Sequence, residues 1–172
     1  FESDIMKLEC TQDNLDKALS HISRAVSTRT TLPITQNVLL KAVEGKLQLS
    51  ATNLEMALNT WIGASIAQEG ETTIPARLLT DLIRTFPNQN INLESDNENN
   101  TINIKCGPYD SNLITQPTED FPPIPQVENL EPQFEINAEV LLKLINSVIF
   151  SAAQDQSRPV LTGIKFSIEN NT

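Results

Sequence analysis

Residues 11–26, TQDNLDKALSHISRAV, carry a pattern that returns later in the chain. The apolar residues recur at intervals of three and four, which predicts an amphipathic helix over Thr11–Val26. Thr11 or Asp13 can accept hydrogen bonds from the free amides of its first turn. Lys7–Cys10 alternates as a short strand before this helix. Three alternating runs after it predict strands: Val38–Val43, Leu47–Thr52 and Met56–Ile66.

The pattern restarts near residue 72. Thr72–Ile74 predicts a strand and Pro75–Phe86 a helix, which Pro75 can open because its missing amide hydrogen would be unpaired there. The residues expected to face inward on this helix are Leu78, Leu79, Leu82, Ile83 and Phe86. Further strands are expected at Ile91–Leu93, Thr101–Cys106 and Tyr109–Thr115, with an acidic, Asn-rich hairpin at Ser95–Asn100.

A third copy begins after a proline-rich stretch. The prolines of 122–132 predict an extended linker between domains. Beyond it we expect a strand at Gln133–Ile136, a helix at Ala138–Ser151 and a strand at Gly163–Ile168. Residues 6–121 are therefore expected to form one domain of two half-units, and residues 133–172 the truncated start of a second domain. Residues 1–5 are expected to be an added leader, with Met6 as the natural start.

Five apolar positions recur at fixed offsets, against the alternative of chance matches in a chain rich in strands and helices. They are Leu15, Leu19, Ile22, Val38 and Leu40. The residues 64 positions on are Leu79, Ile83, Phe86, Ile102 and Ile104. The residues 126 positions on are Leu141, Ile145, Val148, Ile164 and Phe166. This regularity is typical of an internal repeat, so the expected fold class is α+β, with repeated β-α-β-β-β half-units and helices on one face of antiparallel sheets. Because the third copy lacks its last strands, we expect the chain to be a fragment.

Composition narrows the class of protein. At 172 residues and 39% hydrophobic content, the chain can bury a core. No stretch approaches the roughly 20 apolar residues that span a bilayer, and no signal segment opens the chain. Cys10 and Cys106 lie in apolar strand patterns that are typical of buried thiols. We therefore expect a cytoplasmic protein without disulfides, metal sites or contact with a membrane.

The charge is unevenly distributed. A net charge of −10 argues at first against binding to nucleic acid. The three expected helices, however, sum to +1, so the strands, loops and linker hold −11. Lys17, His21 and Arg24 form one stripe, Arg77 and Arg84 repeat its seven-residue step, and Lys143 is equivalent to Lys17. Two interpretations remain open: an ordinary solvated face, or a basic lining that touches phosphates without reading bases.

Signs of catalysis are weak. His21 is the single histidine, and nothing marks a partner for a nucleophilic triad. The glycines are scattered, so no phosphate-binding loop is present in the sequence. Alternating acids at Glu94, Asp96 and Glu98 fit a solvated turn better than a cation site. These patterns favour a binding protein over an enzyme, and no cofactor is expected.

Four segments occur in order along the chain: Thr31-Leu32-Pro33-Ile34, Thr52-Asn53-Leu54-Glu55-Met56, Ile74-Pro75-Ala76-Arg77 and Glu119-Asp120-Phe121-Pro122. Together they resemble the bacterial sliding clamp family, the beta subunit of DNA polymerase III, and the resemblance covers Met6–Thr172. It implies the DNA clamp fold and a non-catalytic processivity factor of DNA replication. In that family, two three-domain chains close head to tail around duplex DNA, with helices lining the hole.

The resemblance also implies partners and DNA-facing residues. The implied partners are double-stranded DNA, replicative and translesion polymerases, the clamp loader and a second copy of the chain as a homodimer. Arg29 matches a DNA-facing arginine of the family, and further cations are expected on the hole-facing helices. These cations are Lys17, Arg24, Arg77 and Lys143.

Two apolar sites are implied as well. Arg158 and Leu161 match the opening residues of a pocket for partner peptides, although Pro159 and Val160 stand where the family often has aromatics. Leu78, Leu82 and Leu113 resemble the subunit interface, and Leu82 fits a core position equally well. The alternatives are a scaffold that shares the repeat without encircling DNA and, more remotely, a small hydrolase that uses His21.

Overall fold

The computed structural model describes residues 5–26, 32–124, 134–155 and 157–168. The chain divides into two units, Phe1–Pro125 and Gln126–Thr172. In the first unit the strands are β1 (Lys7–Thr11), β2 (Asn37–Val43), β3 (Lys46–Thr52), β4 (Ala57–Gly63), β5 (Ser65–Gln68), β6 (Gly70–Pro75), β7 (Asn90–Asp96), β8 (Thr101–Cys106) and β9 (Tyr109–Ile114). Its helices are α1 (Gln12–Ile22) and α2 (Ala76–Thr85), with short 3-10 turns at Ser23–Ala25, Pro33–Gln36 and Thr118–Asp120.

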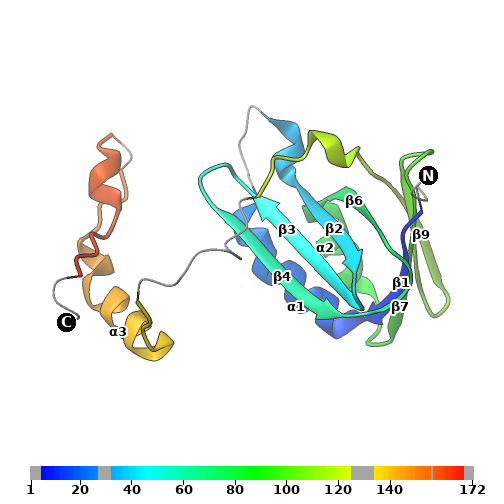
Figure 1. Ribbon diagram of the computed structural model, residues 1–172, viewed down its shortest axis with the longest axis horizontal. Helices are drawn as coiled ribbons and strands as arrows, with labels where there is room; N and C mark the ends of the chain where they lie inside the picture. Colours follow the sequence, from blue (N-terminus) through cyan, green and yellow to red (C-terminus); the bar gives the residue numbers. More distant parts are fainter. Residues whose placement is uncertain (1–4, 27–31, 125–133, 156, 169–172) are drawn as a thin grey trace. The chain divides into compact units, whose positions relative to one another are not determined.

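The strands form two antiparallel sheets in which the half-units are interleaved. One sheet has the order β5-β1-β7-β8-β9 and the other β4-β3-β2-β6. The first strand of each half-unit thus lies in the sheet of the other half, since β1 pairs with β7 and β6 pairs with β2. Both helices lie on the same side of the four-stranded sheet (Figure 1). The fold of this unit is α+β.

The pairing of β1 with β7 and the pairing of β6 with β2 have equivalent registers. Leu8 lies opposite Leu93 and Cys10 opposite Ile91, and the corresponding pairs at the other junction are Thr72 with Leu40 and Ile74 with Val38. The offset of 64 therefore holds for the first strand and the helix of each half.

For the next strand the predicted offset of 64 is wrong. The counterparts of Val38 and Leu40 are Ile91 and Leu93, 53 positions on, and not Ile102 and Ile104, which lie in β8. The reason is that the connection after the helix is shorter in the second half, where α2 ends at Thr85 and β7 begins at Asn90.

One continuous core joins both sheets and both helices. Helix α1 begins after Thr11, whose side chain accepts from the amide of Asn14 at 3.4 Å, and it buries Leu15, Leu19 and Ile22 completely. Helix α2 likewise buries Leu79 and Ile83. Burial of these aliphatic side chains, each contributing roughly 1.5–3 kcal/mol, is the main stabilising term.

The expected strand Met56–Ile66 is two strands. Residues Ala57–Gly63 pair with β3 in the four-stranded sheet, whereas Ser65–Gln68 pair with β1 in the other sheet. Between them the amide of Ala64 donates to the carbonyl oxygen of Gly45 at 3.2 Å. Because the alternation of apolar residues continues through the crossing, the sequence pattern does not reveal the change of sheet.

The second unit contains helix α3 (Ala138–Val148), preceded by Asn137, whose side chain accepts from the amides of Glu139 and Val140. Two 3-10 turns follow, at Ile149–Ser151 and Pro159–Thr162. The strands expected at Gln133–Ile136 and Gly163–Ile168 do not form in the described parts of those ranges. A strand needs a hydrogen-bonded neighbour, and the described residues of this unit supply none. No residue of α3 is buried.

Candidate nucleic-acid interface

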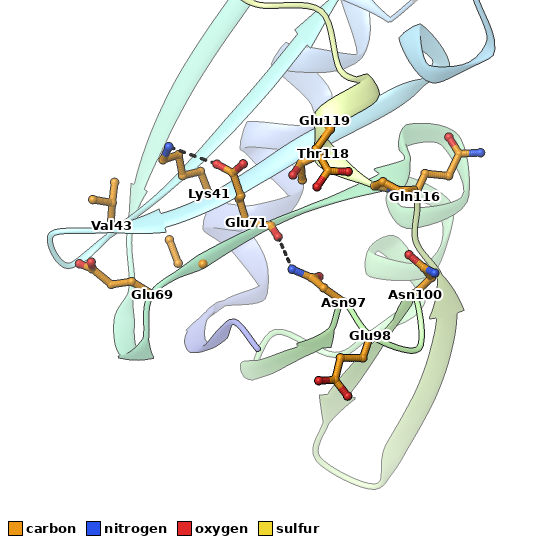
Figure 2. A pocket seen from close by; sticks show the side chains of 13 residues that line it. Lys41, Val43, Glu69, Glu71, Asn97, Glu98, Asn100, Gln116, Thr118 and Glu119 are labelled. Atoms are coloured by element: carbon orange, nitrogen blue, oxygen red, sulfur yellow. Dashed lines mark hydrogen bonds and ion pairs between the residues drawn. The ribbon is translucent and has the colours of Figure 1, made fainter. Parts of the chain in front are cut away.

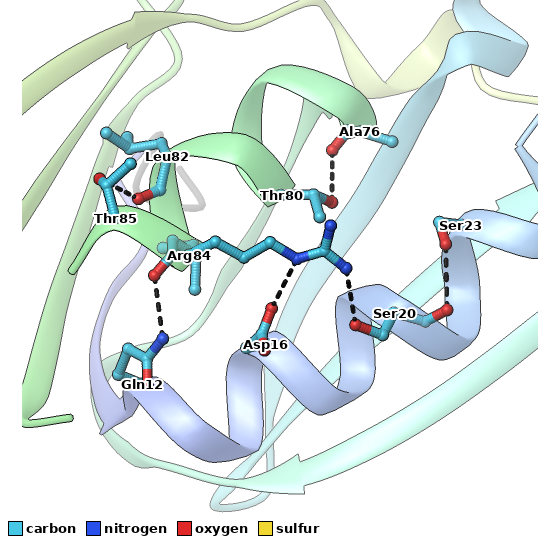
Figure 3. Close-up of polar contacts among 10 residues, drawn as sticks. Gln12, Asp16, Ser20, Ser23, Ala76, Thr80, Leu82, Arg84 and Thr85 are labelled. Atoms are coloured by element: carbon cyan, nitrogen blue, oxygen red, sulfur yellow. Dashed lines mark hydrogen bonds and ion pairs between the residues drawn. The ribbon is translucent and has the colours of Figure 1, made fainter. Parts of the chain in front are cut away.

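Helices α1 and α2 lie side by side and are joined by Arg84 (Figure 3). The Nε atom of Arg84 lies 3.3 Å from Oδ1 of Asp16, and its Nη2 donates to Oγ of Ser20 at 3.2 Å. The side-chain amide of Gln12 donates to the carbonyl oxygen of Ile83 at 3.0 Å. The two helices therefore present their polar sides as one surface, which we call the helix face.

Three further cations lie on the helix face. The Nζ atom of Lys17 lies 2.6 Å from Oδ2 of Asp13, and the side chain of Lys17 is 67% exposed. The Nε atom of Arg77 lies 3.9 Å from Oδ2 of Asp81, and its side chain is 96% exposed. Arg24 is exposed in the turn after α1 and has no acidic partner among the described residues. These long exposed side chains can reach phosphate oxygens without further movement of the backbone.

The two intrahelical pairs have opposite polarity at equivalent positions. Asp13 and Lys17 correspond, 64 positions on, to Arg77 and Asp81. An acid in the first turn followed by a base suits the helix dipole, but Arg77 stands in the first turn of α2, where a cation costs about 0.3–1 kcal/mol. Stability of the helix does not explain a cation at position 77.

The remaining predicted residues are Lys143, Arg29 and the stripe residue His21. Lys143 is exposed on α3, in the second unit. Arg29 lies outside the described residues. His21 is exposed in the last turn of α1. The structure thus brings Lys17 and Arg77 onto one pair of packed helices, with Arg24 in the turn that follows α1, and it adds Arg84 to them.

The predicted partner-pocket residues share one turn of the second unit. The amide of Leu161 donates to the carbonyl oxygen of Arg158 at 3.0 Å, and the amide of Ala153 donates to the carbonyl oxygen of Leu161 at 2.9 Å. Arg158 and Leu161 are both exposed, and Leu161 is 51% exposed.

The predicted interface leucines divide into two groups. Leu82 and Leu113 are half-buried and pack against the core of the first unit. Leu78 is 49% exposed, so its expected inward position on the helix is wrong. The helical repeat explains this, because Leu79 and Ile83 already fill the buried stripe and Leu78 lies beside it.

Acidic residues gather in a groove that is lined by residues of strands and loops (Figure 2). Its charged lining residues are Lys41, Glu69, Glu71, Glu98 and Glu119, and neither α1 nor α2 contributes to it. Lys41 pairs with Glu71 at 3.1 Å, which leaves the groove strongly negative. Among the described residues, no group of three or more His, Cys, Asp or Glu side chains could hold a metal ion. This groove is unsuited to phosphates.

The thiols do not offer a nucleophile. Burial, and to a smaller extent the neighbouring Glu9 carboxylate, raises the pKa of the Cys10 thiol to about 12. Burial also raises the pKa of the Cys106 thiol. A thiol reacts through its thiolate, so both side chains are inert near neutral pH.

In the part of the chain that the structure describes, no helix has the length and apolar character to cross a membrane.

The summed charge of each helix does not reveal the acidic partners on the helix face. The spacing of four between Asp13 and Lys17, and between Arg77 and Asp81, was a usable signal. The contact between Arg84 and Asp16 joins residues 68 apart in sequence, so only the packing of the two helices reveals it.

Comparisons with known proteins give a consistent result. Residues 6–125 match the family model of the DNA polymerase III beta subunit, N-terminal domain, and residues 135–172 match that of its central domain. The beta sliding clamp of Synechococcus elongatus is 32% identical over 167 residues, covering 95% of this chain and 44% of that protein. The beta sliding clamp of Proteus mirabilis is 35% identical over 167 residues, covering 96% of this chain and 45% of that protein.

Solved structures are similar as well. The DNA polymerase sliding clamp from Caulobacter crescentus has a TM-score of 0.83 at 31% identity, covering 92% of this chain and 43% of that one. The sliding clamp from Bacillus subtilis has a TM-score of 0.86 at 24% identity, with the same coverage, which shows a likeness of fold. The chain spans less than half the length of the relatives that it matches.

Proposed function

Because the chain belongs to the DNA polymerase III beta subunit family and has its α+β clamp fold, we propose that it forms part of a sliding clamp, a non-catalytic processivity factor. The observation that carries the proposal is the helix face. It presents Lys17, Arg24 and Arg77 together, while glutamates gather in a groove that neither helix lines. Duplex DNA is the partner that this separation of charge suits.

The mode of binding is contact with phosphates and not with bases. The cations are solvent-exposed ends of flexible side chains, and α1 and α2 carry no Phe, Tyr or Trp to stack against a base. Such contacts are sequence-independent and sensitive to salt. Retention on DNA then comes from closure of a ring made with a second copy, while each contact stays weak enough for sliding.

The remaining partners follow from the same proposal. Replicative and translesion polymerases and a clamp loader would bind surfaces of the whole clamp. One of these surfaces would be a pocket whose first residues along the chain are Arg158 and Leu161. We propose that the clamp acts in the cytoplasm, where bacterial DNA is replicated. Leu78, Leu82 and Leu113 are proposed as contributors to the contact between subunits, and Arg29 and Lys143 as further DNA-facing cations.

The helix face can be tested by charge removal. Arg24→Ala should weaken binding to a short fluorescent duplex and flatten the salt dependence by about one unit of slope. Arg77→Ala should weaken binding too, with a smaller change of slope, because Asp81 lies 3.9 Å from this cation. The matched control is Lys105→Ala, which also removes one exposed cation, here from a 3.4 Å pair with Asp110 on the sheets. Equal effects from all three variants would contradict a DNA-facing helix pair.

Ring closure is tested separately with the full-length protein. Protein loaded on circular duplex DNA should dissociate when the circle is cut, because release then needs only sliding past an end. Retention on the linearised DNA would favour the alternative, a scaffold that binds DNA without encircling it.

A further inference from the structure

We propose that Asp13, Asp16 and Asp81 limit the affinity of the helix face for DNA, and so act as residues that keep its contacts weak. The inference rests on the proposed function and deepens it. It concerns acids that stand on the surface expected to meet a polyanion, where a simple basic lining would have none.

Each of these acids forms an ion pair with a cation of the helix face. Asp13 lies 2.6 Å from Lys17, Asp16 lies 3.3 Å from Arg84, and Asp81 lies 3.9 Å from Arg77. Three of the four cations of the helix face are thus paired, and Arg24 is the cation without an acidic partner among the described residues. The face is nearly balanced in charge although it is rich in basic side chains.

A contribution to folding stability does not explain these ion pairs well. The side chains of the Lys17–Asp13 pair are 67% and 47% exposed, and those of the Arg77–Asp81 pair are 96% and 66% exposed. Ion pairs this exposed add little to folding, because solvent screens them and both side chains lose freedom. The Arg77–Asp81 pair also runs against the helix dipole. The Arg84–Asp16 pair differs, since it joins two helices and therefore has a structural role as well.

The pairs act on DNA through short-range electrostatics. A phosphate that approaches Lys17 or Arg77 also meets a carboxylate within about 4 Å of the same cation, well inside the roughly 8 Å Debye length of physiological salt. The phosphate must displace that carboxylate or share the cation with it. Both routes weaken the contact and lower the number of counterions that binding releases.

The test uses isosteric removal of charge. Asp13→Asn and Asp81→Asn should each tighten binding to a short fluorescent duplex, by up to about eightfold at about 0.1 M salt, and steepen the salt dependence by up to about one unit. These two variants leave the contacts of Arg84 with Asp16 and Ser20 intact, so a folding defect is not expected. Thermal melts of the variants check that the fold is retained. Asp16→Asn should tighten binding too, with some loss of thermal stability.

The matched control is Asp110→Asn. It removes one exposed acid from a pair with Lys105 at 3.4 Å on the sheets, and it should change affinity less than about twofold because the helix face is untouched. Equal tightening by Asp110→Asn and the helix variants, or no tightening by Asp13→Asn and Asp81→Asn, would overturn the inference. If Arg24→Ala and Arg77→Ala still weaken binding in that case, the proposed function stands and only this inference fails.

Discussion

Asn37 is 3% exposed and joins three segments that are far apart in sequence. Its side-chain amide donates to Oγ1 of Thr73 at 3.2 Å and to Oε1 of Gln116 at 2.9 Å. The Thr73 hydroxyl in turn donates to the carbonyl oxygen of Gln116 at 2.8 Å, and the amide of Gln116 donates to the carbonyl oxygen of Thr73 at 3.1 Å. This network fixes the segment that follows β9 across β2 and β6.

Asn37→Ala should lower the free energy of unfolding by about 1–3 kcal/mol, since it leaves the Thr73 hydroxyl and the Gln116 side chain short of a partner in a part-buried site. Urea denaturation measures the change. Asn112→Ala is the matched control, because Asn112 is exposed and water can replace its hydrogen bond with Asn103. Comparable losses in both variants would show that the network has no special role.

The raised pKa of Cys10 predicts a pH dependence. An ordinary thiol has a pKa of 9.0 and the folded value is about 12, so the unfolded chain loses this proton first as pH rises. The stabilisation is complete below pH 9 and is lost progressively toward pH 12. Urea midpoints should fall over that range, and less so for Cys10→Val. Rapid reaction of folded protein with Ellman's reagent at Cys10 near pH 8, followed by mass spectrometry, would contradict the burial.

At the scale of elements, the first residue of β6 lies against Met6, the residue that precedes β1. A Cβ built on Gly70 would lie 3.0 Å from Cβ and 3.3 Å from Cα of Met6, which is fully buried. The two segments therefore approach so closely at Gly70 that a residue with a Cβ would not fit without a shift. This contact joins the start of β6, in one sheet, to the residue that precedes β1 of the other sheet.

Gly70→Ala should destabilise the fold by about 1–3 kcal/mol, because either the Met6 backbone or β6 must move. Gly63→Ala is the control, since a Cβ there meets nothing within 4 Å. That variant should be neutral or slightly stabilising, because alanine lowers the entropy of the unfolded chain. Thermal melts of both variants distinguish the two expectations.

Periodicity predicted most of the elements of the first unit and their core positions. Leu15, Leu19 and Ile83 are fully buried, as their spacing required. The crossing from β4 to β5 escaped prediction because both strands keep the same alternation on either side of Ala64. The strands of the second unit were predicted from alternation alone, and alternation does not provide the neighbouring strand that a sheet needs.

At the scale of the whole molecule, the sequence located the basic stripe but described its electrostatics only in part. The spacing identifies Lys17, Arg24 and Arg77, and the structure places Lys17 and Arg77 on packed helices of one unit and Arg24 in the turn after α1. Their acidic partners change the meaning of that stripe. The surface is a set of neutral pairs with one unpaired cation among the described residues, and this balance depends on Arg84, whose contact with Asp16 crosses between helices.

The interleaving of the sheets has a consequence for what one half-unit could form alone. An isolated half-unit would expose β1 without β7, and β2 without β6, so it could complete its sheets only by trading first strands with a second copy of itself. Such an assembly is a domain-swapped homodimer. The first unit has the connectivity that such a dimer would have if its two copies were joined end to end, with β5 among the residues that link the halves. The link turns a bimolecular encounter into closure of a short loop, so folding no longer depends on protein concentration.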